Sequence, residues 1–212
     1  MKTVILDFDG TIGDSRSLIV ATMQATMARL GLPVCGAERC AGTIGLPLRD
    51  SFMQLISMDD ETGKQCERVY TELFLENNVP GTVKMFPGVK DTIARIHAAG
   101  HIVAIASSRG RDSLTSFVRE MNLERYVSHI VSADDVEHSK PSPDMVLRIL
   151  ELTDTRKEDA LVVGDAVYDI EMAHNAGVKA CGVTYGNGTL EELSGADYVI
   201  GSFAGLADIL KL

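Results

Sequence analysis

The sequence lacks any apolar run long enough to cross a bilayer, and its start has no feature of a secretion signal. Met1-Lys2 leads directly into a short apolar stretch that predicts a strand. A CxxC pair is also missing, although the chain contains Cys35, Cys40, Cys66 and Cys181. Four cysteines could form two disulfides, but without a secretion signal we expect reduced thiols. These absences predict a cytoplasmic protein with no membrane partner.

Positive charge is scarce as well. The 20 Lys and Arg residues are outnumbered by 30 Asp and Glu residues, which gives a formal net charge of −10. No cluster of Lys and Arg is present to grip a nucleic-acid backbone, so we expect no nucleic-acid partner. The five histidines share no spacing typical of metal ligands. A small anionic substrate remains compatible with this charge, because a bound cation can reverse the local field.

What the sequence does contain is a regular alternation of apolar strands and helical patterns. Strands are expected at residues 3–6, 102–106, 129–132, 160–163, 180–183 and 198–200, with helices between most of them. Alternation at such intervals predicts βαβ units and a parallel sheet. We therefore predict an α/β fold, with a Rossmann-like parallel sheet as its core and helices on both faces.

The early part of the chain departs from this alternation. Ile19, Met23, Met27 and Leu30 fall on one face at helical spacing, and further helices are expected at 37–41, 48–58 and 59–78. No convincing strand lies between residues 14 and 80. A chain of 212 residues fits one main domain with a smaller insertion. We predict a core domain of residues 1–14 and 82–212 and an inserted all-helical domain of residues 15–81.

Three later positions carry signals for the start of a helix. Ser142 followed by Pro143 predicts an N-cap with proline in the first turn. Thr155 with Glu158, and Thr189 with Glu192, have the spacing of a capping box.

The strongest chemical signal is the acidic pair that follows the first strand. Asp7 and Asp9 are two residues apart, so their side chains can point the same way. Gly10 then allows the backbone to turn tightly and approach a ligand. Two carboxylates this close repel each other unless a cation compensates, which indicates a metal site. The alternative is an ordinary acidic turn.

Polar residues also follow the next three strands. Ser107, Ser108 and Arg109 follow the second strand, Lys140 lies beyond the third, and the run Gly164 to Asp169 follows the fourth. Taken alone, each of these residues has an ordinary structural interpretation, such as a turn serine, a surface lysine or a helix N-cap. Ligands of parallel sheets bind at the carboxyl ends of the strands, so together these residues predict one site.

In this combination the chain resembles the haloacid dehalogenase-like (HAD) hydrolase superfamily. The resemblance rests on Asp7-Phe8-Asp9-Gly10-Thr11, Ser107, Lys140 and the Gly164-Asp165 to Asp169 run, which together span most of the chain. The helical insertion looks like that family's C1-type cap. The stretches 45–50, 182–186 and 196–200 resemble the phosphoglycolate phosphatase and pyrophosphatase branch. Ala166 and Ser139 depart from the usual pattern of that branch without removing a catalytic atom.

The resemblance implies roles for the residues of the first and last motifs. Asp7 would be the nucleophile, and Asp9 the acid that protonates the leaving oxygen and later activates water. Mg²⁺ would be held by the Asp7 carboxylate, the Asp9 backbone carbonyl and the Asp165 carboxylate. Asp169 would orient the lysine or a metal-bound water. Gly10 would allow the backbone to approach the phosphate.

Phosphate and substrate contacts are expected from the remaining residues. By the same resemblance, Ser107 and the backbone of Ser108 would hold phosphoryl oxygens, and Lys140 would neutralise phosphate charge. Arg109, and Arg49 in the helical insertion, are predicted substrate anchors, with Arg49 suited to a substrate carboxylate.

The function implied is Mg²⁺-dependent hydrolysis of a small phosphorylated metabolite, such as phosphoglycolate or a sugar phosphate, through an aspartyl phosphate. Asp9 favours phosphoester chemistry, because relatives that cleave carbon–halogen bonds lack an acid there. One alternative is a mutase like β-phosphoglucomutase, although residues 15–19 lack the histidine of that branch. Another is a receiver-like phosphorylation switch, which the acidic pair on one strand and the helical insertion disfavour. No pattern in the sequence predicts the oligomeric state.

Overall fold

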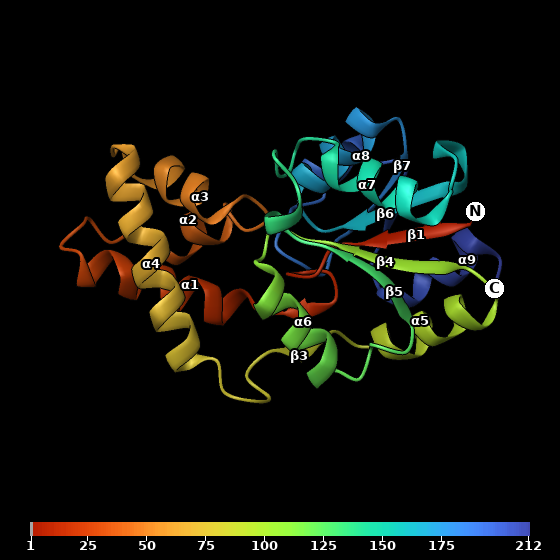
Figure 1. Cartoon of the computed structure of the whole chain (residues 1–212), viewed down its shortest axis with the longest axis horizontal. Helices are drawn as coiled ribbons and strands as arrows, with labels where there is room; N and C mark the ends of the chain where they lie inside the picture. The colour runs from red at the N-terminus through yellow and green to blue at the C-terminus, as the bar shows by residue number, and fades with distance from the viewer. Residues whose placement is uncertain (1) are drawn as a thin grey trace.

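The computed structural model describes residues 2–212 and is built around a six-stranded sheet (Figure 1). The strands are β1 (Thr3–Leu6), β4 (Ile102–Ala106), β5 (Val127–Val131), β6 (Ala160–Gly164), β7 (Lys179–Val183) and β8 (Tyr198–Ile200). They lie in the order β5-β4-β1-β6-β7-β8, and every neighbouring pair is parallel. The predicted α/β class is confirmed. Met1, which begins the predicted core segment 1–14, lies outside the described residues.

β1 lies inside the sheet, between β4 and β6, and all four of its residues are buried. Leu6 pairs in register with Ile105 of β4 on one side and with Val163 of β6 on the other. The chain continues from β1 to β4 and β5 in one direction, and later to β6, β7 and β8 in the other. A reversal of strand order in a parallel sheet opens a crevice at the carboxyl ends of the strands.

Helices cover both faces of the sheet, as predicted. They are α5 (Val89–Ala98), α6 (Arg111–Glu120), α7 (Asp144–Thr153), α8 (Val167–Ala176) and α9 (Leu206–Leu210). Successive residues of a strand point to opposite faces. Ile5 accordingly packs in one core cluster with α7 and α8, whereas Val4 and Leu6 share the other cluster with α5, α6 and α9. Short 3₁₀ turns lie at Ala133–Asp135, Lys157–Asp159, Glu192–Gly195 and Phe203–Gly205.

The early part of the chain forms a group of helices beside the carboxyl ends of the strands (Figure 1). They are α1 (Arg16–Arg29), α2 (Ala37–Ala41), α3 (Leu48–Leu55) and α4 (Asp60–Asn77). α1 packs along α4, with Met23 and Met27 buried between helices. We call residues 15–81 the helical segment. That it is a separate domain stays a prediction.

Two very short strands were not predicted. β2 (Gly13–Asp14) and β3 (Lys84–Met85) pair antiparallel where the chain enters and leaves the helical segment. Two residues carry too little hydrophobic pattern to indicate a strand, so only the tertiary structure reveals them. The pairing ties the two connections to each other.

One capping prediction is confirmed and two are wrong. Thr189 and Glu192 exchange the reciprocal bonds of a capping box. Ser142 is not the N-cap of α7, because its hydroxyl donates to the Asp144 carboxylate at 2.6 Å and Pro143 precedes the helix. The Thr155 hydroxyl is engaged with other threonines instead of capping a helix.

Among residues 2–212 the structure contains no helix with both the length and the apolar character needed to cross a bilayer.

Candidate active site

Three adjacent strand ends bring Asp7, Ser107 and Asp165 to one edge of the sheet. The residues follow β1, β4 and β6, and parallel pairing in register makes those ends coincide. The Asp7 amide donates to the Val163 carbonyl at 2.9 Å, and the Ser107 amide donates to Val131 at 3.1 Å. The backbone ladder therefore continues up to the first residue of the site on both strands.

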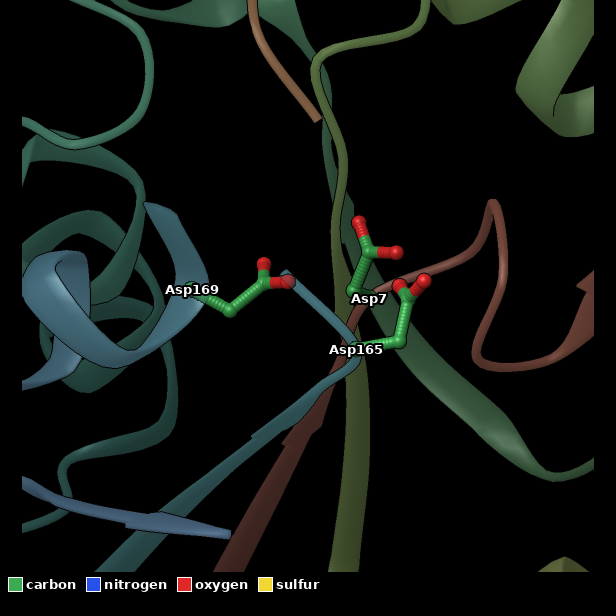
Figure 2. A group of neighbouring side chains, drawn as sticks. All are labelled: Asp7, Asp165 and Asp169. Carbon is green, nitrogen blue, oxygen red and sulfur yellow. The ribbon is translucent and has the colours of Figure 1, made fainter. Parts of the chain in front are cut away.

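Figure 2 shows three carboxylates that point toward one another at this edge. Asp7 comes from the end of β1, Asp165 from the turn after β6, and Asp169 from the first turn of α8. One oxygen from each lies within 4.8 Å of the others, and all three residues are buried. The sequence predicted Asp7 and Asp165 as metal ligands and Asp169 as an orienting residue.

Lys140 is the cation buried with this cluster. Its ammonium donates to the Asp7 carboxylate and, at 2.7 Å, to the Asp169 carboxylate, and the side chain is fully shielded from solvent. Burial alone would lower the pKa of Lys140, but Asp169 and Asp7 raise it above its ordinary value. The lysine is therefore held in its charged form between two carboxylates.

Asp165 is held by donors from two loops. Its Oδ2 accepts bonds from the backbone amide and side-chain amide of Asn187 at 2.6 and 2.9 Å, and its Oδ1 accepts the Thr11 hydroxyl at 3.2 Å. Burial, and then the neighbouring Asp169, raise the pKa of Asp165 to about 7. Sequence reasoning missed Asn187, although it follows β7 and the strand-end argument applied to Asp7 covers it equally.

Two glycines allow the loops to close around Asp165. A Cβ at Gly10, whose φ is +87°, would lie 2.1 Å from Asp165 Oδ2. A Cβ at Gly186 would lie 2.4 Å from both the Asp165 side chain and the Gly10 carbonyl. Any larger residue at either position would displace the carboxylate.

The cluster fits a divalent cation. Burial raises the pKa of Asp7 well above its ordinary value; Lys140 lowers it, while Asp169, Asp165 and Asp9 raise it again. Within residues 2–212 these four carboxylates meet two cationic side chains, Lys140 and Arg109. A divalent cation would balance the remaining negative charge, and carboxylate oxygens are ligands that Mg²⁺ prefers.

Asp9 is turned toward Arg109. The guanidinium donates to the two Asp9 oxygens at 2.6 and 3.1 Å, and the Ser15 hydroxyl donates at 2.5 Å. Phe74 and Phe117 flank the guanidinium, with ring centres 4.8 and 5.0 Å from its central carbon. Arg109 was predicted as a substrate anchor, but its donors are engaged with Asp9. Sequence reasoning missed Ser15 because a helix N-terminal serine carries no catalytic signal.

Ser107 and Ser108 lie beside Asp7 and differ in their partners. The Ser107 hydroxyl is buried and accepts the Arg109 amide at 3.3 Å. The Ser108 hydroxyl donates to the Gly45 carbonyl at 2.6 Å and so connects the sheet edge to the helical segment.

Arg49 lies elsewhere. Its guanidinium donates to Glu67 at 2.7 and 2.9 Å and to Asp60 at 3.1 Å, which pairs α3 with α4. It is not among the residues that line the cavity described next. Acidic residues of its own segment occupy the guanidinium, and a substrate carboxylate at Arg49 stays a prediction.

A cavity of about 450 Å³ lies between the strand ends and the helical segment. Asp7, Asp9, Ser107, Ser108 and Arg109 line its sheet side. The predicted nucleophile and the predicted acid thus face the same cavity.

A family model for haloacid dehalogenase-like hydrolases matches residues 4–183, which is most of the chain. The chain belongs to the haloacid dehalogenase-like hydrolase family. The recognition made from the strand-end motifs is thereby confirmed, and so is the prediction that the chain is an enzyme of the hydrolase class.

Other members of the haloacid dehalogenase-like family are similar over the full length. A pyrophosphatase of Halalkalibacterium halodurans is 29% identical, covering 99% of this chain and 97% of its own. A phosphoglycolate phosphatase of Salmonella typhimurium is 28% identical, covering 100% and 93%. The solved structure of a predicted phosphatase from Clostridium acetobutylicum superposes with a TM-score of 0.90 at 26% identity, covering 100% and 99%. These relatives match the branch that the sequence resembled.

Proposed function

We propose that the chain is a Mg²⁺-dependent phosphatase that hydrolyses a small phosphorylated metabolite through an aspartyl phosphate, in the cytoplasm. The observation that carries the proposal is the shared cavity of Asp7 and Asp9, with Lys140, Asp165 and Asp169 buried behind Asp7. The names of the relatives, a phosphoglycolate phosphatase and a pyrophosphatase, support the same chemistry.

The reaction proceeds in two steps at Asp7. A carboxylate oxygen of Asp7 forms a bond to phosphorus while the bond from phosphorus to the leaving oxygen breaks, and Asp9 gives that oxygen a proton. Water then attacks the aspartyl phosphate and loses a proton to Asp9, which releases inorganic phosphate and restores Asp7. Splitting the displacement in this way replaces one difficult step by two easier ones.

The transferred phosphoryl group needs donors on its other oxygens. Ser107 lines the cavity beside Asp7, and Ser108 lines the same space. Lys140 balances negative charge at Asp7, and Asp169 holds the lysine in place from α8. These groups orient the phosphate for in-line attack.

Mg²⁺ would be held by the carboxylates of Asp7 and Asp165 together with the Asp9 backbone carbonyl. When bound, the cation would reduce the repulsion between the phosphate and the attacking carboxylate. A carboxylate oxygen of the buried Asp169 belongs to the same cluster and adds to its negative charge.

The helical segment limits the size of the substrate. We propose that residues 15–81 form a cap domain on a core of residues 1–14 and 82–212, joined through the paired β2 and β3. A cavity of about 450 Å³ under this cap holds a small phosphomonoester but no folded protein or nucleic acid. Covering the site also excludes bulk water while Asp7 attacks.

The test is a turnover screen of purified protein against phosphoglycolate, sugar phosphates, p-nitrophenyl phosphate and a folded phosphoprotein. Phosphate release from at least one small ester, dependent on added Mg²⁺ and absent for the phosphoprotein, is expected. Absence of release from every small ester, or efficient release from the phosphoprotein, contradicts the proposal.

A further inference from the structure

The cavity wall opposite Asp7 comes from the helical segment and is mainly apolar. Met23 of α1, Ile44 and Leu46 before α3, Leu48 of α3, and Phe74 and Leu75 of α4 all line it. Leu75 is 70% exposed, which leaves a large apolar side chain at the mouth of the site with little to cover it. An apolar wall stabilises a bound apolar group by removing its surface from water, but it provides no hydrogen bond or opposite charge to a charged group.

The aliphatic hydroxyl groups in that wall are already satisfied by nearby backbone, whereas the phenol of Tyr70, which also lines the cavity, has no hydrogen-bond partner among residues 2–212. Thr43 donates to the Cys40 carbonyl at 2.8 Å, and Thr71 donates to Glu67 at 2.8 Å. Ser51 donates to the Thr43 carbonyl at 3.1 Å. A polyol in the cavity would therefore lose its water and gain little more than the single Tyr70 hydroxyl from this wall, and a loss of that kind is unfavourable.

The cations near the cavity are occupied too. Arg109 is paired with Asp9, and Arg111 is paired with Asp135 at 2.5 Å. Asp112 and Asp134 also line the cavity and add negative charge. A carboxylate on the leaving group would thus face like charges, with no uncommitted cation among the described lining residues.

We propose that the leaving group of the substrate is a neutral and largely apolar alcohol with the size of an aromatic ring. Benzene fits a cavity of about 150 Å³. A space of about 450 Å³ accommodates such a ring together with a phosphoryl group. This inference rests on the proposed phosphatase function and narrows its substrate class: phosphoglycolate and sugar phosphates become poor substrates.

The inference is tested by comparing esters whose alcohols have similar acidity, so that binding rather than leaving-group chemistry decides the rate. kcat/KM is measured with Mg²⁺ for benzyl phosphate and 2-phenylethyl phosphate, and for glycerol phosphate and phosphoglycolate. Burying a ring in an apolar pocket predicts an advantage of at least about tenfold for the aromatic esters. Equal values, or a preference for phosphoglycolate, overturn the inference.

A substitution at the cavity mouth gives an independent test. Leu75→Lys keeps a good helix former at an exposed position and places a cation where the wall is apolar. The ratio of kcat/KM for benzyl phosphate over phosphoglycolate should fall at least about threefold, since roughly one buried methylene group is worth that much. Leu152→Lys, on the exposed face of α7 and outside the cavity, is the matched control and should leave the ratio unchanged.

The ratio of kcat/KM for benzyl phosphate over phosphoglycolate distinguishes a failure of this inference from a failure of the proposed function. No turnover of any ester refutes the phosphatase, whereas turnover with an unaltered ratio in Leu75→Lys refutes only the apolar leaving group.

Discussion

Replacing Lys140 with methionine should remove a large part of the stability of the fold. The change deletes one charge and keeps a side chain of similar length. Lys140 is fully shielded, and its partners Asp7 and Asp169 are 5% and 1% exposed at the side chain. Removing one partner of a buried ion pair costs about 3–5 kcal/mol, because the other charge stays buried without compensation. The total free energy of unfolding of a domain is about 5–15 kcal/mol, so this loss is a substantial share of it.

The pH dependence of that loss follows from the direction of each pKa shift. The pKa of Lys140 is raised by its carboxylate partners, so its stabilising effect is fully present throughout the neutral range. In the variant both Asp7 and Asp169 lose this partner, and the pKa of Asp7, raised already by burial, rises further without the lysine. A carboxyl with a raised pKa destabilises the fold at high pH and stops doing so once it is protonated. The loss should therefore shrink as the pH falls toward the ordinary pKa of 3.8.

Urea denaturation in the presence of a chelator measures both effects, at about pH 7.5 and about pH 5. Lys64→Met is the matched control, because its ammonium lies 2.7 Å from Asp60, the same distance as between Lys140 and Asp169, but both groups are exposed. The control should change stability little. A loss in Lys140→Met no larger than in the control, or equal at both pH values, would refute this reasoning.

The remaining predictions concern chemistry. Asp7→Asn should abolish phosphate release, because an amide oxygen is a poor nucleophile, whereas Asp9→Asn should slow turnover by about 10²- to 10⁴-fold in steady-state assays. Exhaustive chelation should remove activity, and titration with Mg²⁺ should restore it while the larger Ca²⁺ restores it poorly. Because the pKa of Asp165 is raised to about 7, a proton competes with the metal, so calorimetric Mg²⁺ affinity should increase between about pH 6 and about pH 8. Arg49→Ala should leave KM for phosphoglycolate unchanged, since its guanidinium is paired within the helical segment; a selective increase for this ester would instead support the substrate contact expected from the sequence.

The sheet and the edge that carries the site could be predicted because their signals are local. Buried apolar runs identify strands, and parallel strands bring their ends together whatever the loops do between them. Asp7, Ser107 and Asp165 each follow such a run directly. The position of Lys140, beyond β5 and a 3₁₀ turn, has no local signal, so its role came from the family resemblance.

The hydrogen-bond and ion-pair partners of individual side chains could not be predicted, since they depend on packing between segments far apart in the sequence. Arg49 and Arg109 have the same side chain, yet one pairs with α4 and the other with Asp9, 100 residues away. The same limit applies to Ser142, where a nearby aspartate competed for the expected capping hydroxyl. Asn187 was accessible to the strand-end argument and was missed only because the argument was applied to four strands.

The central claim is that Asp7 carries the phosphoryl group, and the direct measurement is to find it there. p-Nitrophenolate leaves without protonation, so Asp9→Asn should still transfer phosphate from p-nitrophenyl phosphate but release it slowly. Rapid acid quench with phosphorus-labelled substrate, followed by acid-stable peptide mapping, should recover label on the peptide that contains Asp7. Asp7→Asn with Asp9→Asn should give none. Label on Ser107, or turnover of Asp9→Asn with no labelled peptide at any quench time, would contradict the account.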